Sequence, residues 1–193
     1  MATNAQIITP TIGSSRPTGT TQVGTVVSKT GLACKEHGSG PVRCTEFTFT
    51  NMTVTMTDEA GVVLYGGQQL YDFPAGVIKF LGAVADLDIT GTGNVTATFD
   101  GDVGVGTTTA GNNNALATTE QNVIPTTSTP QAVASVTTAN AFSTATEDAS
   151  VDGTSTSVDL FLNFLVDDAD HNGGGITVTS GTLKVYWINM GDY

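Results

Sequence analysis

The stretch Val158-Asp-Leu-Phe-Leu-Asn-Phe-Leu-Val166 decides the fold class of this chain. Successive side chains of an extended strand point to opposite faces, and the alternate positions that share one face here are all apolar: Val158, Leu160, Leu162, Phe164 and Val166. The other face carries Phe161 and Leu165. Because a strand that is apolar on both faces must be covered on both, the pattern predicts a second sheet layer together with further cover, from a long loop or another subunit.

The residues that follow this strand repeat the pattern. A turn rich in Asp, Asn and Gly, from Asp167 to Gly175, leads to two more predicted strands, Ile176–Thr179 and Thr182–Met190. The last strand again has two apolar faces, one with Leu183, Val185 and Trp187 and the other with Tyr186, Ile188 and Met190. A strand on the outside of a monomeric sandwich would carry polar residues on its second face.

The composition of the whole chain agrees with an all-β protein. Thr and Val favour strands, Gly interrupts them, and no long window has an apolar period of 3.6 residues. We therefore predict an antiparallel β-sandwich that forms a single domain over residues 23–193. The polar segment Met1 to Gln22 has too little apolar surface to fold alone, and is expected to be a disordered tail or an extended N-terminal arm that orders on a neighbouring subunit.

Between residues 102 and 153 large apolar residues become sparse, while Thr and Ala become common. This region is predicted to form long loops and short edge strands, near Val123–Ile124 and Ala132–Thr138. Pro125 and Pro130 would keep these strands at an edge, because proline cannot donate a hydrogen bond to a neighbouring strand.

The net charge of −12, from 18 acidic and 6 basic residues, argues against two classes of partner. Nucleic-acid binding depends mostly on Lys and Arg at phosphates, and attraction to anionic membranes depends on the same residues. The N-terminal residues lack a basic segment followed by an apolar one, and no apolar run is long enough to span a bilayer. We expect synthesis in a cytoplasm and no association with nucleic acid or membrane.

The two cysteines lie in a predicted hairpin, whose strands are Val23–Cys34 and Val42–Thr57. Cys34 and Cys44 are symmetric about Ser39, so a turn centred there would place them opposite each other. Three interpretations follow: two buried free thiols, a disulfide, or a metal site that includes His37. A zinc site usually needs four ligands, which makes the metal site the weakest of the three.

Two strands have irregular apolar patterns. In the hairpin, Phe47 and Phe49 are apolar at odd positions, whereas Met52, Val54 and Met56 are apolar at even ones, so a β-bulge or a bend is predicted near Asn51. In the stretch Val77–Ile89, one face has Val77, Leu81, Ala83, Ala85, Leu87 and Ile89, and the other has Ile78, Phe80 and Val84. We interpret this stretch as a second strand that needs cover on both faces.

The motifs that would carry chemistry are incomplete. Asp168, Asp170 and Asn172 match the first half of a calcium loop, but Thr179 stands where the bidentate glutamate belongs, so a polar turn is the preferred interpretation. Gly91–Gly93 and Gly101–Gly106 are not followed by the Lys of a phosphate loop and are predicted to be turns.

Catalytic groupings are equally sparse. Asp86 and Asp88 would lie on one face of a strand, most simply as a solvated strand end, and the chain has only two histidines for acid–base work. We predict no catalytic residue, no cofactor and no enzymatic activity.

Several segments resemble virion structural proteins of tailed bacteriophages. They are Asp159–Phe164, Ile176–Leu183, Tyr186–Tyr193, Gly76–Leu87 and Thr119–Thr126, and together they cover somewhat less than half of the chain. The resemblance implies a head-associated β-sandwich of the jelly-roll type. It further implies a capsid decoration, or cement, protein that is located outside the shell and bound to the major capsid protein.

Such a protein would act by burying surface between capsid subunits. We expect a homotrimer whose interface contains Phe161, Leu165, Tyr186, Ile188 and Met190. The alternative is a carbohydrate- or receptor-binding module of a phage fibre or tail, which exposed aromatic side chains over a shallow face would mark. A third possibility, an enzyme that degrades polysaccharides, would need a pair of carboxylates in a cleft.

Overall fold

A computed structural model describes most of the chain, in seven ranges: residues 23–38, 42–59, 63–92, 101–129, 137–144, 150–167 and 174–191. Three of the predicted features lie wholly or mostly outside these ranges. They are the N-terminal arm over residues 1–22, the edge strand near Ala132–Thr138, and the calcium half-motif at Asp168, Asp170 and Asn172.

The described residues form strands and one short 3₁₀ helix. The strands are β1 (Thr25–Val26), β2 (Leu32–His37), β3 (Val42–Thr55), β4 (Thr57–Glu59), β5 (Val63–Asp72), β6 (Gly76–Thr92), β7 (Gly101–Gly106), β8 (Ile124–Thr129), β9 (Thr137–Thr144), β10 (Ser150–Gly153), β11 (Asp159–Asp167) and β12 (Gly175–Asn189). The 3₁₀ helix is η1 (Thr118–Glu120).

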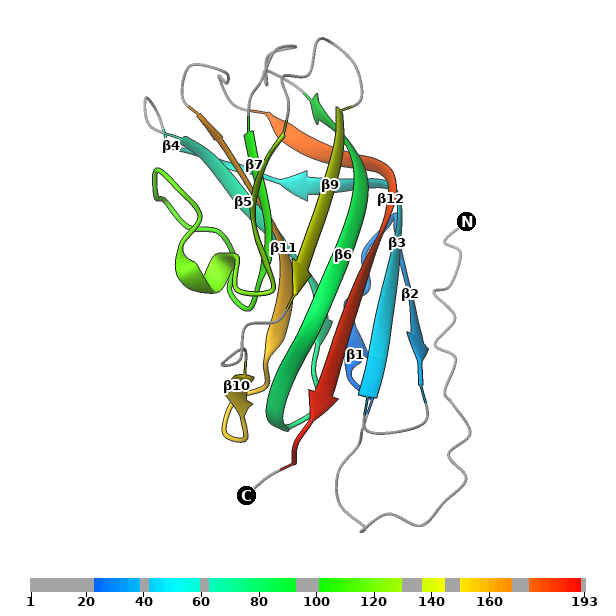
Figure 1. Ribbon diagram of the computed structural model, residues 1–193. Helices are drawn as coiled ribbons and strands as arrows, with labels where there is room; N and C mark the ends of the chain where they lie inside the picture. The colour runs from blue at the N-terminus through cyan, green and yellow to red at the C-terminus, as the bar shows by residue number, and fades with distance from the viewer. Residues whose placement is uncertain are drawn as a thin grey trace.

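These strands form two antiparallel six-stranded sheets packed face to face (Figure 1). The β11 sheet has the order β1-β5-β11-β7-β8, with β4 paired to β5. The β12 sheet has the order β10-β6-β12-β3-β2, with β9 paired to β6. The predicted all-β sandwich is therefore confirmed.

The connectivity is that of a jelly roll. When the three shortest strands, β1, β4 and β10, and the edge strand β2 are set aside, eight strands remain. The chain passes from one sheet to the other between all consecutive pairs of these eight strands except β7 and β8. One sheet runs β3-β12-β6-β9, the first, eighth, third and sixth of these strands, and the other runs β5-β11-β7-β8, the second, seventh, fourth and fifth. This order arises when a long antiparallel hairpin wraps around itself to form two Greek keys.

The core lies between the two sheets and is centred on aromatic side chains. Trp187 is fully buried, and its indole Nε1 donates a hydrogen bond to Thr45 Oγ1 at 2.8 Å. Phe73 packs edge-to-face against Trp187, Tyr71 and Phe80, with ring centroids 5.0 to 5.3 Å apart. The apolar faces predicted for β11 and for the end of β12 both point into this core.

The strand β6 differs from the prediction, because it has one buried face and not two. Trp187 pairs with Phe80 and Tyr186 pairs with Gly82, so Leu81 is an extra residue that shifts the register. This bulge turns Ile78 and Phe80 into the same core as the alternate residues that follow: Ala83, Ala85, Leu87 and Ile89. The change of phase in the sequence therefore came from a bulge and not from a strand with two apolar faces.

The predicted irregularity near Asn51 is confirmed. Asn51 has a positive φ of 51°, and Phe49 on one side and Met52 on the other are both buried. The neighbouring strand β12 has its own register shift between Val178 and Ser180. Because β12 continues through this shift, the two strands predicted over Ile176–Thr179 and Thr182–Met190 are one long strand.

The stretch Gly101–Gly106 is also not a turn. It forms β7, an inner strand between β11 and β8. Gly106 is required for close packing, because a Cβ there would lie 2.3 Å from the backbone of Glu120, whereas a Cβ on Gly104 would displace Leu116 Cδ1, at 2.8 Å.

Candidate interaction surface

The five residues predicted to form a subunit interface lie on two different sheets. Phe161 and Leu165 belong to the outer face of the β11 sheet, whereas Tyr186, Ile188 and Met190 lie on or just after the last strand of the β12 sheet. Leu165 is only 2% exposed and packs with Ala110 and Leu116. The prediction is wrong for Leu165, because a loop of the same chain covers it.

This covering loop runs from Thr107 to Val123 and is fixed by a buried amide. Asn163, at the centre of β11, accepts a hydrogen bond from the Ala110 backbone amide at 2.9 Å through Oδ1. Its Nδ2 donates to the carbonyl oxygens of Thr108 and Glu120, at 2.9 and 2.7 Å. Asn163 is fully buried, so these bonds satisfy a polar group that would otherwise destabilise the core.

The loop also has an internal support in Glu120, which is buried at the end of η1. Its two carboxylate oxygens accept hydrogen bonds from the backbone amides of Gly111 and Ala117, at 2.8 and 2.6 Å. Figure 1 shows η1 on one side of the molecule and β2 on the other. Around Leu165 and Asn163, the outer face of the β11 sheet is thus covered from within the chain.

The outer face of the β12 sheet has the opposite character. Within the described ranges, every large hydrophobic side chain that is exposed lies on this sheet or directly after it: Val42, Leu81, Val84, Tyr186 and Met190, at 37 to 47% exposure. Together with the half-buried Ile188 they form what we call the apolar face. The alternation in the sequence predicted that Tyr186, Ile188 and Met190 share a face outside the core. It did not predict that Leu81 and Val84 of β6 are exposed on the same sheet, because the bulge at Leu81 changes the phase of that strand.

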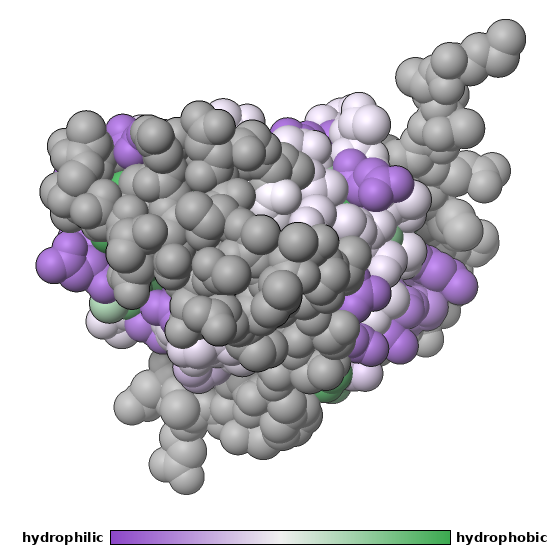
Figure 2. Space-filling model, turned by 90° about the horizontal axis from the view of Figure 1, so that it is seen from above, coloured by the Kyte–Doolittle hydropathy of each residue, from purple (hydrophilic) through white to green (hydrophobic). Residues whose placement is uncertain are grey.

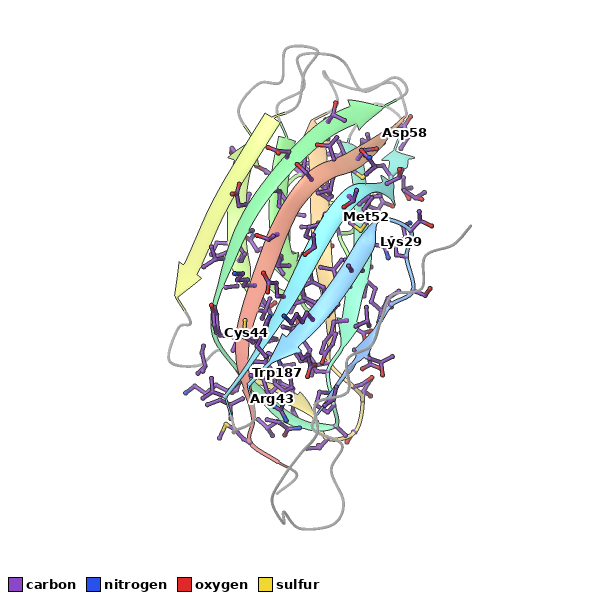
Figure 3. The ribbon with its side chains drawn as sticks, turned by 90° about the vertical axis from the view of Figure 1, so that its right-hand side faces the viewer. Lys29, Arg43, Cys44, Met52, Asp58 and Trp187 are labelled. Carbon is purple, nitrogen blue, oxygen red and sulfur yellow. The ribbon has the colours of Figure 1, made fainter. Side chains whose placement is uncertain are left out.

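Strand register shows which residues of the apolar face are neighbours, with Lys184 opposite Val84. Tyr186 on β12 lies opposite Gly82 on β6, and the neighbouring Ile188 lies opposite Val42 on β3. Gly82 has no side chain, so the face is open beside the Tyr186 ring. Figure 3 views this sheet with β6, β12, β3 and β2 side by side, and Cys44, Arg43 and Trp187 lie toward the same end of it.

Charged side chains border the apolar face. Glu46 accepts from His37 Nε2 at 2.8 Å and pairs with Lys184 Nζ at 3.3 Å. The hydrogen bond from His37, and then that from Lys184, holds the pKa of Glu46 below its usual value. Lys35 lies opposite Glu46 in the register, and Lys79 lies opposite Ile188. Half of the six basic residues of this acidic chain therefore lie on or beside this face.

The other half of the same sheet surface is polar. Thr48, Thr50 and Thr53 are exposed on β3, and Ser180 Oγ donates to Asp88 Oδ2 at 2.6 Å. Asp86 is exposed on this part of β6, as expected for a solvated strand end. Figure 2 views the whole molecule from above. The coloured residues on this side are mostly hydrophilic or intermediate, and hydrophobic colour is confined to small separate areas.

The two cysteines are free thiols, as in the first of the three interpretations, although both are only partly buried, and the alternative of a disulfide between them is wrong. In the hairpin Cys34 pairs with Phe47 and Cys44 pairs with His37, so they are not opposite each other. Cys34 faces the interior, where burial and then Glu36 raise its pKa to about 12. Burial also raises the pKa of Cys44, against a hydrogen bond with Tyr186 that lowers it.

Two further observations complete the description of the surface. Among the described residues, no three His, Cys, Asp or Glu side chains are grouped as metal ligands, and Cys34, His37 and Cys44 do not converge. In the same residues, no helix has the length and apolar character needed to cross a bilayer.

A comparison of the chain with protein-family models, with curated proteins and with solved structures found no match.

Proposed function

We propose that this protein is a virion structural protein, a capsid decoration or cement protein that stabilises a phage head from the outside of the shell. It would act without catalysis and without a cofactor, by burying surface against its own copies and against the major capsid protein. Synthesis would take place in the host cytoplasm, before assembly onto the virion.

The apolar face is the single observation that carries this proposal. A chain with net charge −12 gains nothing from exposing Tyr186, Val84 and Leu81 together on one sheet, unless another surface covers them. Aromatic residues at the centre with charged residues around them are typical of protein–protein interfaces. The residues His37, Glu46 and Lys184 form such a charged border here.

The fold and the sequence add support. Jelly rolls occur in viral capsid domains and in lectins, so the fold is compatible with a virion role, although a fold alone does not define a function. The resemblance of the segments Asp159–Phe164 and Tyr186–Tyr193 to virion proteins points in the same direction.

A homotrimer is the assembly we propose for this protein. Tyr186, Ile188 and Met190 would contribute to its interface, and Leu165 would not, because it is buried inside the subunit. In a ring of three, one part of the apolar face would contact a different part of the neighbour's surface, as rotational symmetry of this order requires. The rest of the exposed surface would remain for the shell.

Localisation tests this function. Antibodies against the full chain, visualised by electron microscopy on intact virions, are expected to label the head evenly. A second assay adds the purified protein to undecorated heads and measures co-sedimentation, which is expected to saturate. Label confined to fibres or the tail would contradict the proposal and favour the receptor-binding alternative, and absence of label from virions would refute both.

A further inference from the structure

Met190 differs from the other described methionines in its exposure. Met52 and Met56 point into the core and are 0% and 9% exposed, whereas Met190, directly after β12, is 44% exposed. The remaining methionine, Met1, lies outside the described residues. A peroxide oxidises a methionine when it can reach the sulfur atom, so Met190 is the methionine of the described fold that this reaction would select.

Backbone hydrogen bonds fix the position of Met190 beside β6. The Met190 amide donates to the Val77 carbonyl oxygen at 2.8 Å, and the Val77 amide donates to the Gly191 carbonyl oxygen at 2.9 Å. Because the preceding residue, Asn189, is buried and side chains alternate along an extended chain, Met190 shares the outer side with Ile188. The exposed sulfur atom therefore belongs to the apolar face.

Oxidation would change the character of this part of the apolar face. The thioether of methionine is apolar and adaptable, which suits a contact between subunits, whereas a sulfoxide carries a polar S=O group that accepts hydrogen bonds. Ile188 and the residue opposite it, Val42, have aliphatic side chains that cannot donate to this oxygen. Burying the sulfoxide oxygen against a neighbouring subunit without a donor would therefore cost free energy.

We propose that Met190 is an oxidation switch for the association of copies: a peroxide converts its thioether to the sulfoxide in the free subunit, and the oxidised subunit no longer assembles through the apolar face. This inference rests on the proposed assembly through that face. In the reaction the sulfur attacks one oxygen of hydrogen peroxide, the O–O bond breaks, one oxygen atom stays on sulfur and the other leaves as water. The sulfur loses two electrons and the peroxide gains them, so no cofactor is needed.

The two thiols are the competing targets for a peroxide. The reactive form of cysteine is the thiolate. Burial raises the pKa of Cys44, and burial and then the charge of Glu36 raise the pKa of Cys34 to about 12, so both thiols are mostly protonated at neutral pH. Oxidation of a thioether requires no loss of a proton, so these conditions do not hold back the reaction of Met190.

The experiment treats the full chain with hydrogen peroxide at neutral pH, locates the added oxygen by mass spectrometry and follows the mass in solution by light scattering. We expect one oxygen on Met190 before any on Met52 or Met56, and a dissociation constant of the assembly that rises about tenfold or more. Met190→Leu keeps an apolar side chain without sulfur, so it should assemble like the wild type and not respond to peroxide. Cys44→Ser is the matched control, because it removes the other sulfur on the outer side of this sheet, and it should respond like the wild type.

Failure of the switch and failure of the assembly give different results. An oxidised Met190 with unchanged association, or an equal response of Met190→Leu and the wild type, would overturn the switch and leave the assembly in place. A wild type that is monomeric before treatment would overturn the proposed assembly, and the switch with it. Dilution below the assembly range should speed the oxidation of Met190, because association covers it. A rate that does not depend on protein concentration would show that Met190 stays outside the contact, which would also overturn the switch.

Discussion

Asn163 and Glu120 are 43 residues apart in the sequence, yet the Asn163 side-chain amide donates to the Glu120 backbone carbonyl at 2.7 Å. This bond joins the middle of β11 to the end of η1 and holds the loop Thr107–Val123 against the outer face of the β11 sheet. Because Asn163 is fully buried, bulk solvent cannot reach its side chain to replace the loop's hydrogen bonds.

Replacement of Asn163 by Leu is therefore expected to lower the free energy of unfolding by about 3 kcal/mol, because the Ala110 amide loses its acceptor and two carbonyls lose their donor. Urea unfolding measures this loss. Asn122→Ala is the control: this side chain bonds only Thr107 in the same loop and is partly exposed, so its loss should be about 1 kcal/mol. Equal stability of Asn163→Leu and the wild type would show that the loop does not depend on this amide.

Gly106 should not tolerate even a methyl group. A Cβ at this position would lie 2.3 Å from the Glu120 carbonyl carbon, and backbone cannot move aside as a flexible side chain can. We expect Gly106→Ala to cost about 2 kcal/mol in thermal unfolding. Gly111→Ala, in the loop Thr107–Val123, meets only side-chain atoms, of Glu120 at 3.3 Å and of Asn113 at 3.5 Å, and should cost clearly less. A reversed order of the two losses would contradict this account of β7.

The apolar face should control self-association. Light scattering of the wild type at tens of micromolar is expected to give the mass of a trimer, and Tyr186→Ser combined with Val84→Ser should weaken association at least about tenfold, since large central side chains dominate interface energies. Thr53→Ser, on the polar half of the same sheet, is the control and should remain trimeric. A wild type that stays monomeric at this concentration would exclude the trimer.

The pH dependence of stability should contain a contribution from Asp159. Burial and then the charge of Asp72, its partner across β11 and β5, raise the pKa of Asp159. The folded state then holds this proton more tightly than the unfolded state, so the contribution to stability is present at low pH and is lost as the pH rises above the usual Asp value through the raised one. Asp159→Asn should therefore be more stable than the wild type at pH 7, and this advantage should vanish at pH 3.

Asp152 provides the matched control for this experiment. Hydrogen bonds from Thr154 Oγ1, at 2.7 Å, and from the Thr154 amide, at 2.9 Å, hold the pKa of Asp152 below its usual value. The stability that Asp152 contributes is present above the usual Asp pKa and is lost as the pH falls through its lowered pKa. Asp152→Asn should therefore bring no gain in stability at pH 7. If both variants shift the melting curve in the same direction at pH 7, the assignment to Asp159 fails.

Both thiols should react with a thiol reagent, at different rates. Cys34 faces the interior and its pKa of about 12 keeps it protonated, whereas Cys44 lies on the outer face of β3 beside Tyr186. In the native protein at pH 8, Cys44 should be modified first, and the unfolded protein should give two thiols without a reductant. A count of zero would mean that the hairpin register differs from the one in which Cys44 pairs with His37.

The parts of the fold that the sequence could predict are those in which one simple period holds. The alternation in Val158–Val166 and in Leu183–Trp187 correctly gave the core faces of β11 and β12. The irregularity near Asn51 was also visible, because the apolar residues change from odd to even positions around a polar one. In these places, burial between the two sheets requires an apolar side chain at every other position.

The parts that could not be predicted depend on contacts between distant segments. The bulge at Leu81 has apolar residues on both sides, so a change of phase looked the same as a strand with two apolar faces. The glycines of β7 resembled a turn, because the loop that needs their small size comes later in the chain. Phe161 and Leu165 predicted cover on that side of β11, but the sequence did not show whether a loop or another subunit would supply it, because the hydrogen bonds of Asn163 that hold the loop join distant segments.

The loop Thr107–Val123 has a consequence for how copies of this protein can build larger objects. Among the described residues it covers Leu165 and Asn163 on the outer face of the β11 sheet, whereas the exposed large hydrophobic side chains lie on or directly after the β12 sheet. If copies associate through the apolar face as we propose, the loop would lie on the side of each subunit that is turned away from that contact.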